Sequence, residues 1–538
     1  MSDNYDFIVV GAGAAGCLLA NRLSADTANR VLLLEAGGKD WNPLIRMPLA
    51  AGLLYFTPSL NWGYATEEQV HMHGRSLKWP RGKVLGGSTA INGMMSIRGQ
   101  RQDYDDWCQT GLSGWSYEDV LPYFKSFEKN VSHNGDDTYH GRDGCLYAEK
   151  ATAGHPLYDA WLECARAAGH SDNEDFNGAT QEGVGTYDFN IKGGRRVSAA
   201  AAFLDPIRNR QNLTVLTRGQ VQRVNIVERV CTGLECRIGG RTKTYTANRE
   251  VILACGAVNS PQLLQLSGIG DGETLKSLDV SIVVDRPAVG QNLQDHIGVY
   301  LQHKCLKPIT LYGLMRPDRA ITAGLKQMLF GAGPAASVPL EVGGFLRTRA
   351  ELDRPDIHVT FVPGLSLATT QAGQMEHGFL TNVYQLRPKS RGSISITSSN
   401  PIDKPRIDPN YLSDEDDIAC LRDGVRLIRN ITKQSALDAY RGAEIAPGVG
   451  AINDDQIDDW IRGSSDTIFH PVGSCRMGAD EESVLDETLR VRGVSNLRVI
   501  DASAMPNIPS GNTSMPTMMI AEKGAAMILQ SHRAPDCG

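Results

Sequence analysis

The stretch YDFIVVGAGAAGCLLANRL, residues 5–23, followed by VLLLE at residues 31–35, decides the fold. Residues 5–10 form a short apolar run that is typical of a buried strand, and the residues after the glycines read as a helix that continues to Leu23. The second apolar run predicts another strand, which ends in Glu35. A strand, a glycine turn, a helix and a strand within about thirty residues indicate a β-α-β unit that binds a dinucleotide.

Three glycines at this turn have separate tasks. Gly11 permits a tight turn, Gly13 lets a pyrophosphate approach the backbone, and Gly16 lets the helix pack closely on the sheet. Glu35 comes at the end of the second strand, where a carboxylate accepts hydrogen bonds from an adenosine ribose and repels a 2′-phosphate. Because the glycine spacing alone also occurs in ordinary turns, its context carries the inference. The β-α-β unit alone does not distinguish an NAD-binding protein from an FAD-binding protein.

The composition sets the wider class. The chain has 538 residues, which suggests two or three structural units. An apolar fraction of 41% and a charged fraction of 21% indicate a globular chain rather than a disordered one. The net charge is -7, with no basic stripe, so we expect no nucleic-acid partner. No run approaches about 18 consecutive apolar residues, so no transmembrane segment is expected.

Cysteine usage and the N-terminus indicate the compartment. The 11 cysteines contain no C-x-x-C pair, which argues against a disulfide framework or a zinc ribbon and favours a reducing compartment. The N-terminus, MSDNYDFIVV, has no basic region before its short apolar run, so we expect no signal peptide. These features predict a cytoplasmic protein, and they leave peripheral membrane attachment open.

Further glycine segments extend the nucleotide-binding pattern. In WPRGKVLGGSTAIN, residues 79–92, Gly86 and Gly87 precede Ser88, so that backbone amides and hydroxyls are offered to a phosphate or a ring edge. A plain connecting loop is the alternative. EVILACGA, residues 250–257, reads as a buried strand that ends in a glycine turn. LRVIDASAMP, residues 497–506, predicts a strand that leads into Asp501, where a polar cofactor tail would be held.

At this point the chain resembles the glucose-methanol-choline (GMC) oxidoreductase family over nearly its whole length. Besides the segments above, the resemblance rests on PAVGQNLQDH at 287–296, LRPKSRG at 386–392, HPVGSCRMG at 470–478 and GNTSMPT at 511–517. These motifs occur in the family's order. The second family signature is slightly imperfect, since Gln265 stands where an aliphatic residue is usual.

The resemblance implies an α/β fold in which a Rossmann-like FAD-binding domain is interleaved with an α+β substrate domain built on an antiparallel sheet. The FAD-binding domain would comprise residues 1–155, 195–300 and 462–530, and the substrate domain residues 156–194 and 301–461. Some family members attach FAD covalently through a histidine just before the asparagine of G-G-S-x-x-x-N. Here that position is Ile91, so we expect tightly bound, non-covalent FAD.

The motifs and the resemblance together imply a set of cofactor-binding residues drawn from glycine turns, strand ends and one helix start. The set is Gly11, Gly13, Ala14, Ala15, Gly16, Glu35, Ala36, Arg81, Gly82, Val84, Gly86, Gly87, Ser88, Asn92, Gly93, Met94, Val221, Cys255, Gly256, Asp501, Ala502, Asn512, Thr513 and Pro516.

The residues after Asn512 read as a helix, with Thr513 or Ser514 as its cap and Pro516 in its first turn. The positive end of this helix, aimed at the flavin N1–C2=O edge, would stabilise the reduced flavin. A C-terminal packing helix is the simpler alternative.

The candidate catalytic residues are His470 and Asn512. An unperturbed imidazole titrates near 6.5, which suits removal of a hydroxyl proton, and a carboxamide can donate to a developing alkoxide. From the residues alone, a core histidine that is hydrogen-bonded beside a proline turn is the favoured interpretation of His470, and the family resemblance reverses it. In the resembled family these two positions face the substrate side of the flavin, as a His/His or a His/Asn pair. The family leaves open whether His470 is the base or an orienting group.

Other side chains carry weaker signals. Glu341 is an acid in an apolar stretch, and Trp62, Tyr64 and Phe361 are plausible lining residues, so an aromatic cage with a carboxylate would suit choline. A structurally paired glutamate is the alternative. His71 and His73 lack a third ligand, and we expect no metal site.

We therefore predict FAD-dependent oxidation of a primary alcohol to an aldehyde, with electrons passed to oxygen or to a quinone-type acceptor. Candidate substrates include choline, aliphatic or polyether alcohols, sugars, and aromatic alcohols such as pyridoxine. Ile468, near His470, is a candidate for control of oxygen access. Alternatives are a redox-silent, FAD-containing lyase of the hydroxynitrile type, an NAD-dependent dehydrogenase that uses only the first unit, and a pure binding protein.

Overall fold

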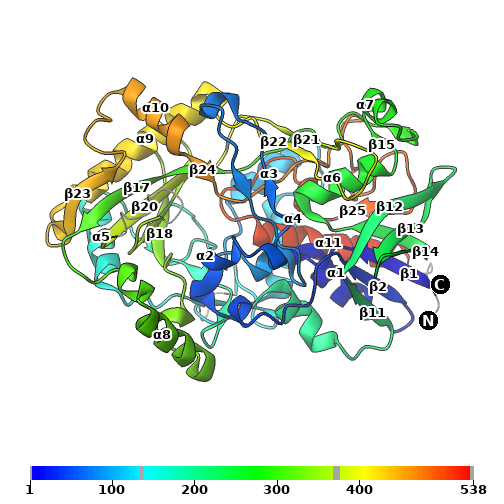
Figure 1. Cartoon of the computed structure of the whole chain (residues 1–538), viewed down its shortest axis with the longest axis horizontal. Coiled ribbons are helices and arrows are strands. Elements are labelled where there is room, and N and C mark those ends of the chain that lie inside the picture. The colour runs from blue at the N-terminus through cyan, green and yellow to red at the C-terminus, as the bar shows by residue number, and fades with distance from the viewer. Residues whose placement is uncertain (1–2, 134–136, 367–375, 533–538) are drawn as a thin grey trace.

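The computed structural model describes residues 3–133, 137–366 and 376–532. Within these residues two seven-stranded sheets lie toward opposite ends of the long axis (Figure 1). The first sheet has the order β11-β2-β1-β14-β13-β12, with β25 beside β14. Its strands are β1 (Asn4–Val10), β2 (Val31–Glu35), β11 (Leu213–Thr217), β12 (Gly219–Val227), β13 (Val230–Ile238), β14 (Arg241–Leu253) and β25 (Leu497–Val499).

The predicted β-α-β unit forms the centre of this sheet. Strand β1 pairs in parallel with both β2 and β14, and α1 (Ala14–Leu23) connects β1 to β2. Gly11 has a φ of 96°, and a Cβ atom there would lie 2.5 Å from the Ala254 carbonyl oxygen. A Cβ atom on Gly16 would lie 1.8 Å from the Gly11 oxygen. Only glycine therefore permits this turn and this close approach of helix to strand.

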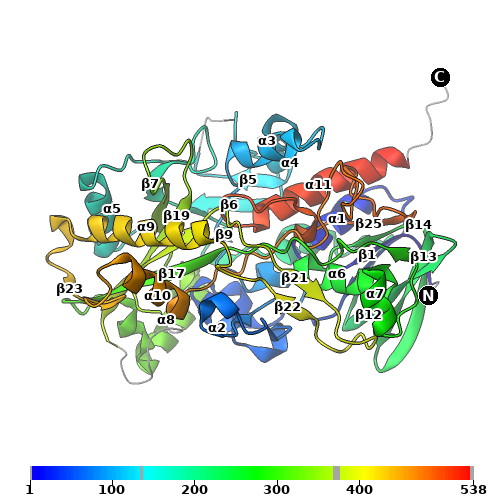
Figure 2. The same ribbon diagram turned by 90° about the horizontal axis from the view of Figure 1, so that it is seen from above.

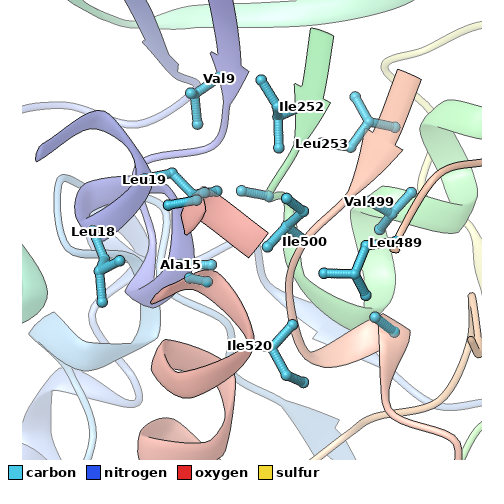
Figure 3. Packing of buried hydrophobic residues seen from close by; sticks show 14 of the residues in the cluster. Val9, Ala15, Leu18, Leu19, Ile252, Leu253, Leu489, Val499, Ile500 and Ile520 are labelled. Carbon is cyan, nitrogen blue, oxygen red and sulfur yellow. The ribbon is translucent and has the colours of Figure 1, made fainter. Parts of the chain in front are cut away.

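The core of this half lies between the sheet and two helices, α1 and α11 (Ser514–Ser531). Figure 3 shows Val9, Ile252 and Val499, from three neighbouring strands, on the side where Leu19 of α1 and Ile520 of α11 lie. All of these side chains are buried. The first and last helices of the chain therefore pack together on one face of the nucleotide sheet.

The second sheet is antiparallel, with the order β23-β17-β20-β19-β18-β7 and with β24 beside β17. Its strands are β7 (Gly183–Thr186), β17 (Ile297–Cys305), β18 (Val342–Leu346), β19 (Ile357–Val362), β20 (Gly378–Gln385), β23 (Arg441–Ala446) and β24 (Asp466–Thr467). Helices α5 (Pro156–Ala167) and α9 (Glu415–Thr432) share an apolar cluster with one face of this sheet, and Figure 2 shows α9 running along it. The opposite face of this sheet is not covered by these two helices.

Shorter elements connect the two halves. The other helices are α2 (Ala51–Leu54), α3 (Arg101–Gln109), α4 (Tyr117–Phe127), α6 (Gly256–Leu266), α7 (Gly272–Ser277), α8 (Pro317–Phe330) and α10 (Asp454–Ser464). The other strands are β3 (Tyr64–Ala65), β4 (Lys78–Trp79), β5 (Glu128–Asn130), β6 (Leu146–Lys150), β8 (Asp188–Phe189), β9 (Ile191–Lys192), β10 (Arg195–Arg196), β15 (Ile269–Gly270), β16 (Val284–Asp285), β21 (Ser393–Ser395) and β22 (Arg406–Asp408). Among the helices in the described ranges, none combines the length and the apolarity needed to cross a bilayer.

The predicted fold class is confirmed, because a nucleotide sheet with a parallel core and an antiparallel second sheet are both present. The domain boundaries stay a prediction. The predicted boundary at residue 300 falls inside β17, and β24, within the predicted range 462–530, pairs with β17 of the second sheet.

Candidate active site

A cavity of about 510 Å³ is lined by residues of both sheets. Gly11, Gly13 and Glu35 line it from the β-α-β unit, and Thr360 and Asn382 line it from the second sheet. The volume lies in the range of small-molecule and cofactor sites. The glycine turn and the free face of the antiparallel sheet therefore border one shared space.

Most of the predicted site residues meet in this cavity. Those that line it are Gly11, Gly13, Ala14, Ala15, Glu35, Ala36, Arg81, Gly82, Gly87, Ser88, Asn92, Gly93, Met94, Val221, Cys255, Gly256, His470, Asp501, Ala502, Asn512 and Thr513.

Four predicted contact residues do not line the cavity. Gly16 packs against Gly11, and Val84 is buried in a small apolar cluster. Gly86 turns the chain with a φ of 89° and donates its amide to the Ala12 carbonyl at 2.8 Å. Pro516 is buried in the first turn of α11. The structure therefore places these residues in the framework behind the cavity wall, because the family motifs mix framework and lining positions.

Glu35 ends β2 beside the glycine turn. Its carboxylate accepts hydrogen bonds from the backbone amides of Ala12 at 2.9 Å and Gly37 at 2.7 Å. Burial raises the pKa of Glu35 to about 7, although both amides and Lys83 act in the opposite direction. The side chain is thus held rigidly at the edge where a ribose would lie.

Asp501 follows β25, and its carboxylate accepts hydrogen bonds from groups of the protein itself. It accepts from the Gly256 amide at 2.8 Å, from the Ser260 hydroxyl at 2.5 Å and from the Ser503 amide at 2.8 Å. Burial raises the pKa of this carboxyl. Asp501 therefore fixes the start of α6 and the turn after β25 where both meet the cavity.

His470 is held by contacts on three sides. Its backbone amide donates to Asp295 Oδ1 at 2.6 Å. Its Nδ1 lies 3.0 Å from Nδ1 of His296, and its Nε2 lies 3.1 Å from Nδ2 of Asn512. The preceding residue, Phe469, has a φ of 65°, and left-handed backbone is strained for a bulky side chain. The predicted pair of His470 and Asn512 is therefore in direct contact.

The hydrogen-bond chain determines where the protons are. His296 Nε2 lies 3.0 Å from the Leu386 carbonyl and must carry a proton to donate to it. Burial lowers the pKa of His296 to about 3, so this ring is neutral and its Nδ1 is an acceptor. His470 must then donate from Nδ1. Its Nε2 is left with a lone pair, which accepts from the Asn512 amide and borders the cavity.

The charge state of His470 agrees with this arrangement. Burial of the imidazole, followed by the proximity of His296 and Arg81, holds the pKa of His470 well below its usual range. The ring is therefore neutral near pH 7 and can take up a proton at Nε2. Within the described residues Asn512 Oδ1 has no partner, and one amide hydrogen of Nδ2 is left for a ligand.

The start of α11 lies beside this pair. Thr513 and Ser514 line the cavity, as the predicted role of a helix N-terminus requires. The predicted side-chain cap is wrong, because Thr513 occupies the N-cap position without a capping hydrogen bond. Its hydroxyl is therefore not what satisfies the first amides of the helix.

The second sheet supplies residues that the sequence analysis missed. His358 and Thr360 of β19 and Asn382 and Tyr384 of β20 alternate along their strands and face the cavity. His358 contacts the Tyr384 hydroxyl through Nδ1 and the Tyr187 hydroxyl through Nε2 at 2.9 Å. The signal was present in β19, where His358 and Thr360 alternate with apolar residues, but not in β20, where Thr381 and Asn382 are adjacent polar residues.

Two expectations for substrate-lining residues are wrong. Tyr64 and Phe361 do not line the cavity, whereas Trp62 and Ile468 do. Phe361 points into the apolar cluster under α5, because neighbouring residues of a strand face opposite sides.

Glu341 is buried and accepts a hydrogen bond from Ser337, so it is a structurally paired acid. Tyr64 is likewise engaged, since its hydroxyl accepts from Asn259 at 2.7 Å.

Some histidines outside the cavity are paired with acids. His71 and His73 are exposed, and His73 lies 3.3 Å from Asp459. His133, His140 and Asp175 have a spacing that could hold a metal ion. However, two carboxylates raise the pKa of His140 to about 9, although burial opposes them. A protonated imidazole has no free lone pair at that nitrogen, so we interpret the group as an ion-pair cluster.

The cavity suits FAD by the chemistry of its wall. Gly13 and Gly87 approach one another so closely that a Cβ atom on Gly87 would lie 2.7 Å from the Gly13 Cα, so only backbone borders the space where a pyrophosphate would pass. Glu35, His470 and the start of α11 line the same cavity. The residues present therefore fit FAD, whose ribose Glu35 would bind.

Comparison with known proteins gives the family. Two family models described as GMC oxidoreductase match residues 5–298 and 388–521. The chain is 43% identical over 526 residues to an oxygen-dependent choline dehydrogenase of Brucella melitensis, a match that covers 97% of this chain and 95% of the relative. It is also 43% identical over 544 residues to the mitochondrial choline dehydrogenase of Mus musculus, covering 99% and 90%.

Solved structures agree. The pyridoxine 4-oxidase of Mesorbium loti is 32% identical with a TM-score of 0.90, covering 99% of this chain and 100% of the other. A formate oxidase of Aspergillus oryzae is 25% identical with a TM-score of 0.93, covering 98% of each chain. The chain therefore belongs to the GMC oxidoreductase family, and it is an FAD-dependent oxidoreductase that acts on CH–OH groups.

Proposed function

We propose that the protein oxidises a primary alcohol to an aldehyde, with His470 as the base and Asn512 as a donor to the substrate oxygen. The observation that carries the proposal is the proton order of the chain from Leu386 through His296 to His470. This order leaves an unprotonated Nε2 atom, which accepts a hydrogen bond from the Asn512 carboxamide, at the wall of the cofactor cavity.

Each residue has a defined task in this reaction. The substrate hydroxyl takes the place of the Asn512 hydrogen at His470 Nε2, and this nitrogen accepts the hydroxyl proton. The amide of Asn512 Nδ2 then binds the substrate oxygen as negative charge develops on it. His296 holds the imidazole in the required tautomer. When bound, FAD supplies the acceptor for the hydride that leaves the carbinol carbon. After transfer His470 is an imidazolium cation, which holds the proton at Nε2 close to the oxygen that it came from.

We further propose that FAD is held without a covalent bond. Ile91, the residue before Asn92, lines the cavity and offers no nucleophile. Cys255 also lines it, but burial raises the pKa of its thiol, so the reactive thiolate is not formed near neutral pH. The backbone of Gly13 and Gly87 would hold the pyrophosphate, and Glu35 the ribose.

The relatives reported above are dehydrogenases and oxidases, so the alternative of a hydroxynitrile-type lyase has no support from them. The name of the Aspergillus oryzae formate oxidase structure refers to FAD, which argues against the NAD-dependent alternative. The electron acceptor, oxygen or a quinone, and the cytoplasmic location stay predictions.

Two measurements test the proposal. Addition of a panel of primary alcohols without oxygen should bleach the flavin absorption of the purified protein, and an aldehyde should appear in equal amount. Acid precipitation should release the yellow flavin into the supernatant. Flavin that is not reduced by any alcohol would overturn the proposed reaction, and flavin that stays with the pellet would overturn non-covalent binding.

A further inference from the structure

We infer that the preferred substrate is an uncharged alcohol with a second hydrogen-bonding group, bound by Asn382, and not a quaternary ammonium alcohol. This inference rests on the proposed alcohol oxidation and adds the substrate class to it. Three features of the cavity carry it: the placement of its charges, the state of its aromatic rings, and an unpartnered carboxamide.

The carboxylates that line the cavity belong to the nucleotide sheet and not to the sheet that carries Asn382. In the part of the chain that the structure describes, the acids that line the cavity are Glu35 and Asp501, both at strand ends of the nucleotide sheet. Each is already hydrogen-bonded to backbone amides. Residues 367–375, which follow the lining residue Ser366, read LATTQAGQM and add no acid.

Asp295 lies behind the wall and is also committed. It does not line the cavity, and its carboxylate accepts from Thr467, from Tyr411 and from the His470 amide. Glu341 accepts a hydrogen bond from Ser337. Neither acid is therefore available to balance a cation beside His470.

A cationic side chain of the protein, Arg81, already lies in the part of the cavity near His470. Arg81 lines the cavity, donates to the Phe469 carbonyl at 2.7 Å, and is close enough to lower the pKa of His470. A substrate ammonium in the same low-dielectric space would be repelled by this guanidinium.

Several aromatic rings of the cavity wall are already engaged within the protein. Trp62 lines the cavity, but the Lys83 ammonium lies 4.2 Å from its ring centroid, and Tyr64 stacks on it at 5.8 Å with planes 5° apart. Tyr55 packs against Phe469 with centroids 5.2 Å apart. A ring that already faces one cation offers little attraction to another.

Asn382 offers an unpaired hydrogen-bonding group to a substrate. It stands on β20 opposite Thr360 of β19, on the face that borders the cavity. Within the described residues its carboxamide makes no hydrogen bond, and its Oδ1 is buried without a partner. An unpaired amide in such a place is destabilising until a ligand pairs with it. A hydroxyl, an amide or a ring nitrogen can do so, whereas a quaternary ammonium has no hydrogen to donate.

The decisive experiment compares matched substrates with the intact holoenzyme. Choline and 3,3-dimethylbutan-1-ol differ only in nitrogen against carbon, and butane-1,4-diol and pentan-1-ol have the same number of heavy atoms. We expect kcat/KM at least tenfold higher for dimethylbutanol than for choline, and higher for the diol than for pentanol. A higher kcat/KM for choline, or equal values for the diol and pentanol, would overturn the inference.

Variants locate the effect at Asn382. Asn382→Asp should raise the choline-to-dimethylbutanol ratio at least tenfold, and Asn382→Leu should remove the diol preference while pentanol is still oxidised. Unchanged ratios in both would refute the role of Asn382. If neither variant binds flavin, the wild-type substrate pairs still decide the charge preference. Failure of every alcohol to reduce the flavin would instead refute the proposed function itself, so the two failures are distinguishable.

Discussion

Replacement of His296 tests the proton order on which the proposed base depends. In His296→Leu the buried Nδ1–H of His470 loses its acceptor, which lies at 3.0 Å in the wild type. An unsatisfied buried donor costs about 1–3 kcal/mol. His470 can avoid this cost only by moving its proton to Nε2, and that tautomer has no lone pair for the substrate.

The reactive Nδ1–H tautomer then lies above the unreactive one by up to about this cost, so the barrier rises by a similar amount, which corresponds to a kcat about 5- to 150-fold lower. The alcohol still has its own contacts, so KM should change little. The assay is stopped-flow reduction of the flavin without oxygen, at saturating alcohol, with the flavin content of each variant measured from its spectrum.

His296→Asn is the matched control. Its carboxamide oxygen takes the place of the Nδ1 acceptor, so the tautomer of His470 is retained and most of the rate should return. Two results would refute the reasoning: a His296→Leu enzyme that reduces flavin at the wild-type rate, or an asparagine variant as slow as the leucine variant with full flavin content.

Other expectations concern the cofactor turn and the ion-pair cluster. Gly11→Ala should lower the flavin content per protein, because its Cβ atom would lie 2.5 Å from the Ala254 oxygen in left-handed backbone, whereas Gly52→Ala, with nothing within 4 Å, should bind flavin normally. His140 has a pKa raised to about 9 in the folded protein, so it stabilises the fold when it is protonated. Its stabilisation is complete below about pH 6.5 and is lost as the pH rises through 9. The melting temperature of the wild type should therefore exceed that of His140→Gln by more at pH 6.5 than at pH 9.5, and an equal gap at both would contradict this assignment.

Local patterns predicted the nucleotide half well. The strand, the glycine turn and the helix are contiguous in sequence, so steric rules for Gly11 and Gly16 apply without knowledge of the rest of the fold. The contact between His470 and Asn512 was predicted from the family resemblance, and the structure adds the distance and the tautomer.

The substrate half was predicted poorly, because long-range strand pairing creates it. Asn382 and His358 meet at the cavity only through the register of β19 and β20, which local sequence does not reveal. For Glu341 the sequence left two roles open, a substrate ligand or a structurally paired acid. The structure supports the second, because Ser337, four residues earlier, is its partner.

The central claim is that His470 takes the hydroxyl proton of an alcohol beside bound FAD. The most direct test is the rate of anaerobic flavin reduction, followed at about 450 nm, in the wild type and in a flavin-replete His470→Gln variant. The account predicts rapid bleaching by an alcohol in the wild type and a rate roughly 10²- to 10⁴-fold lower in the variant. Equal rates in the two proteins would contradict it.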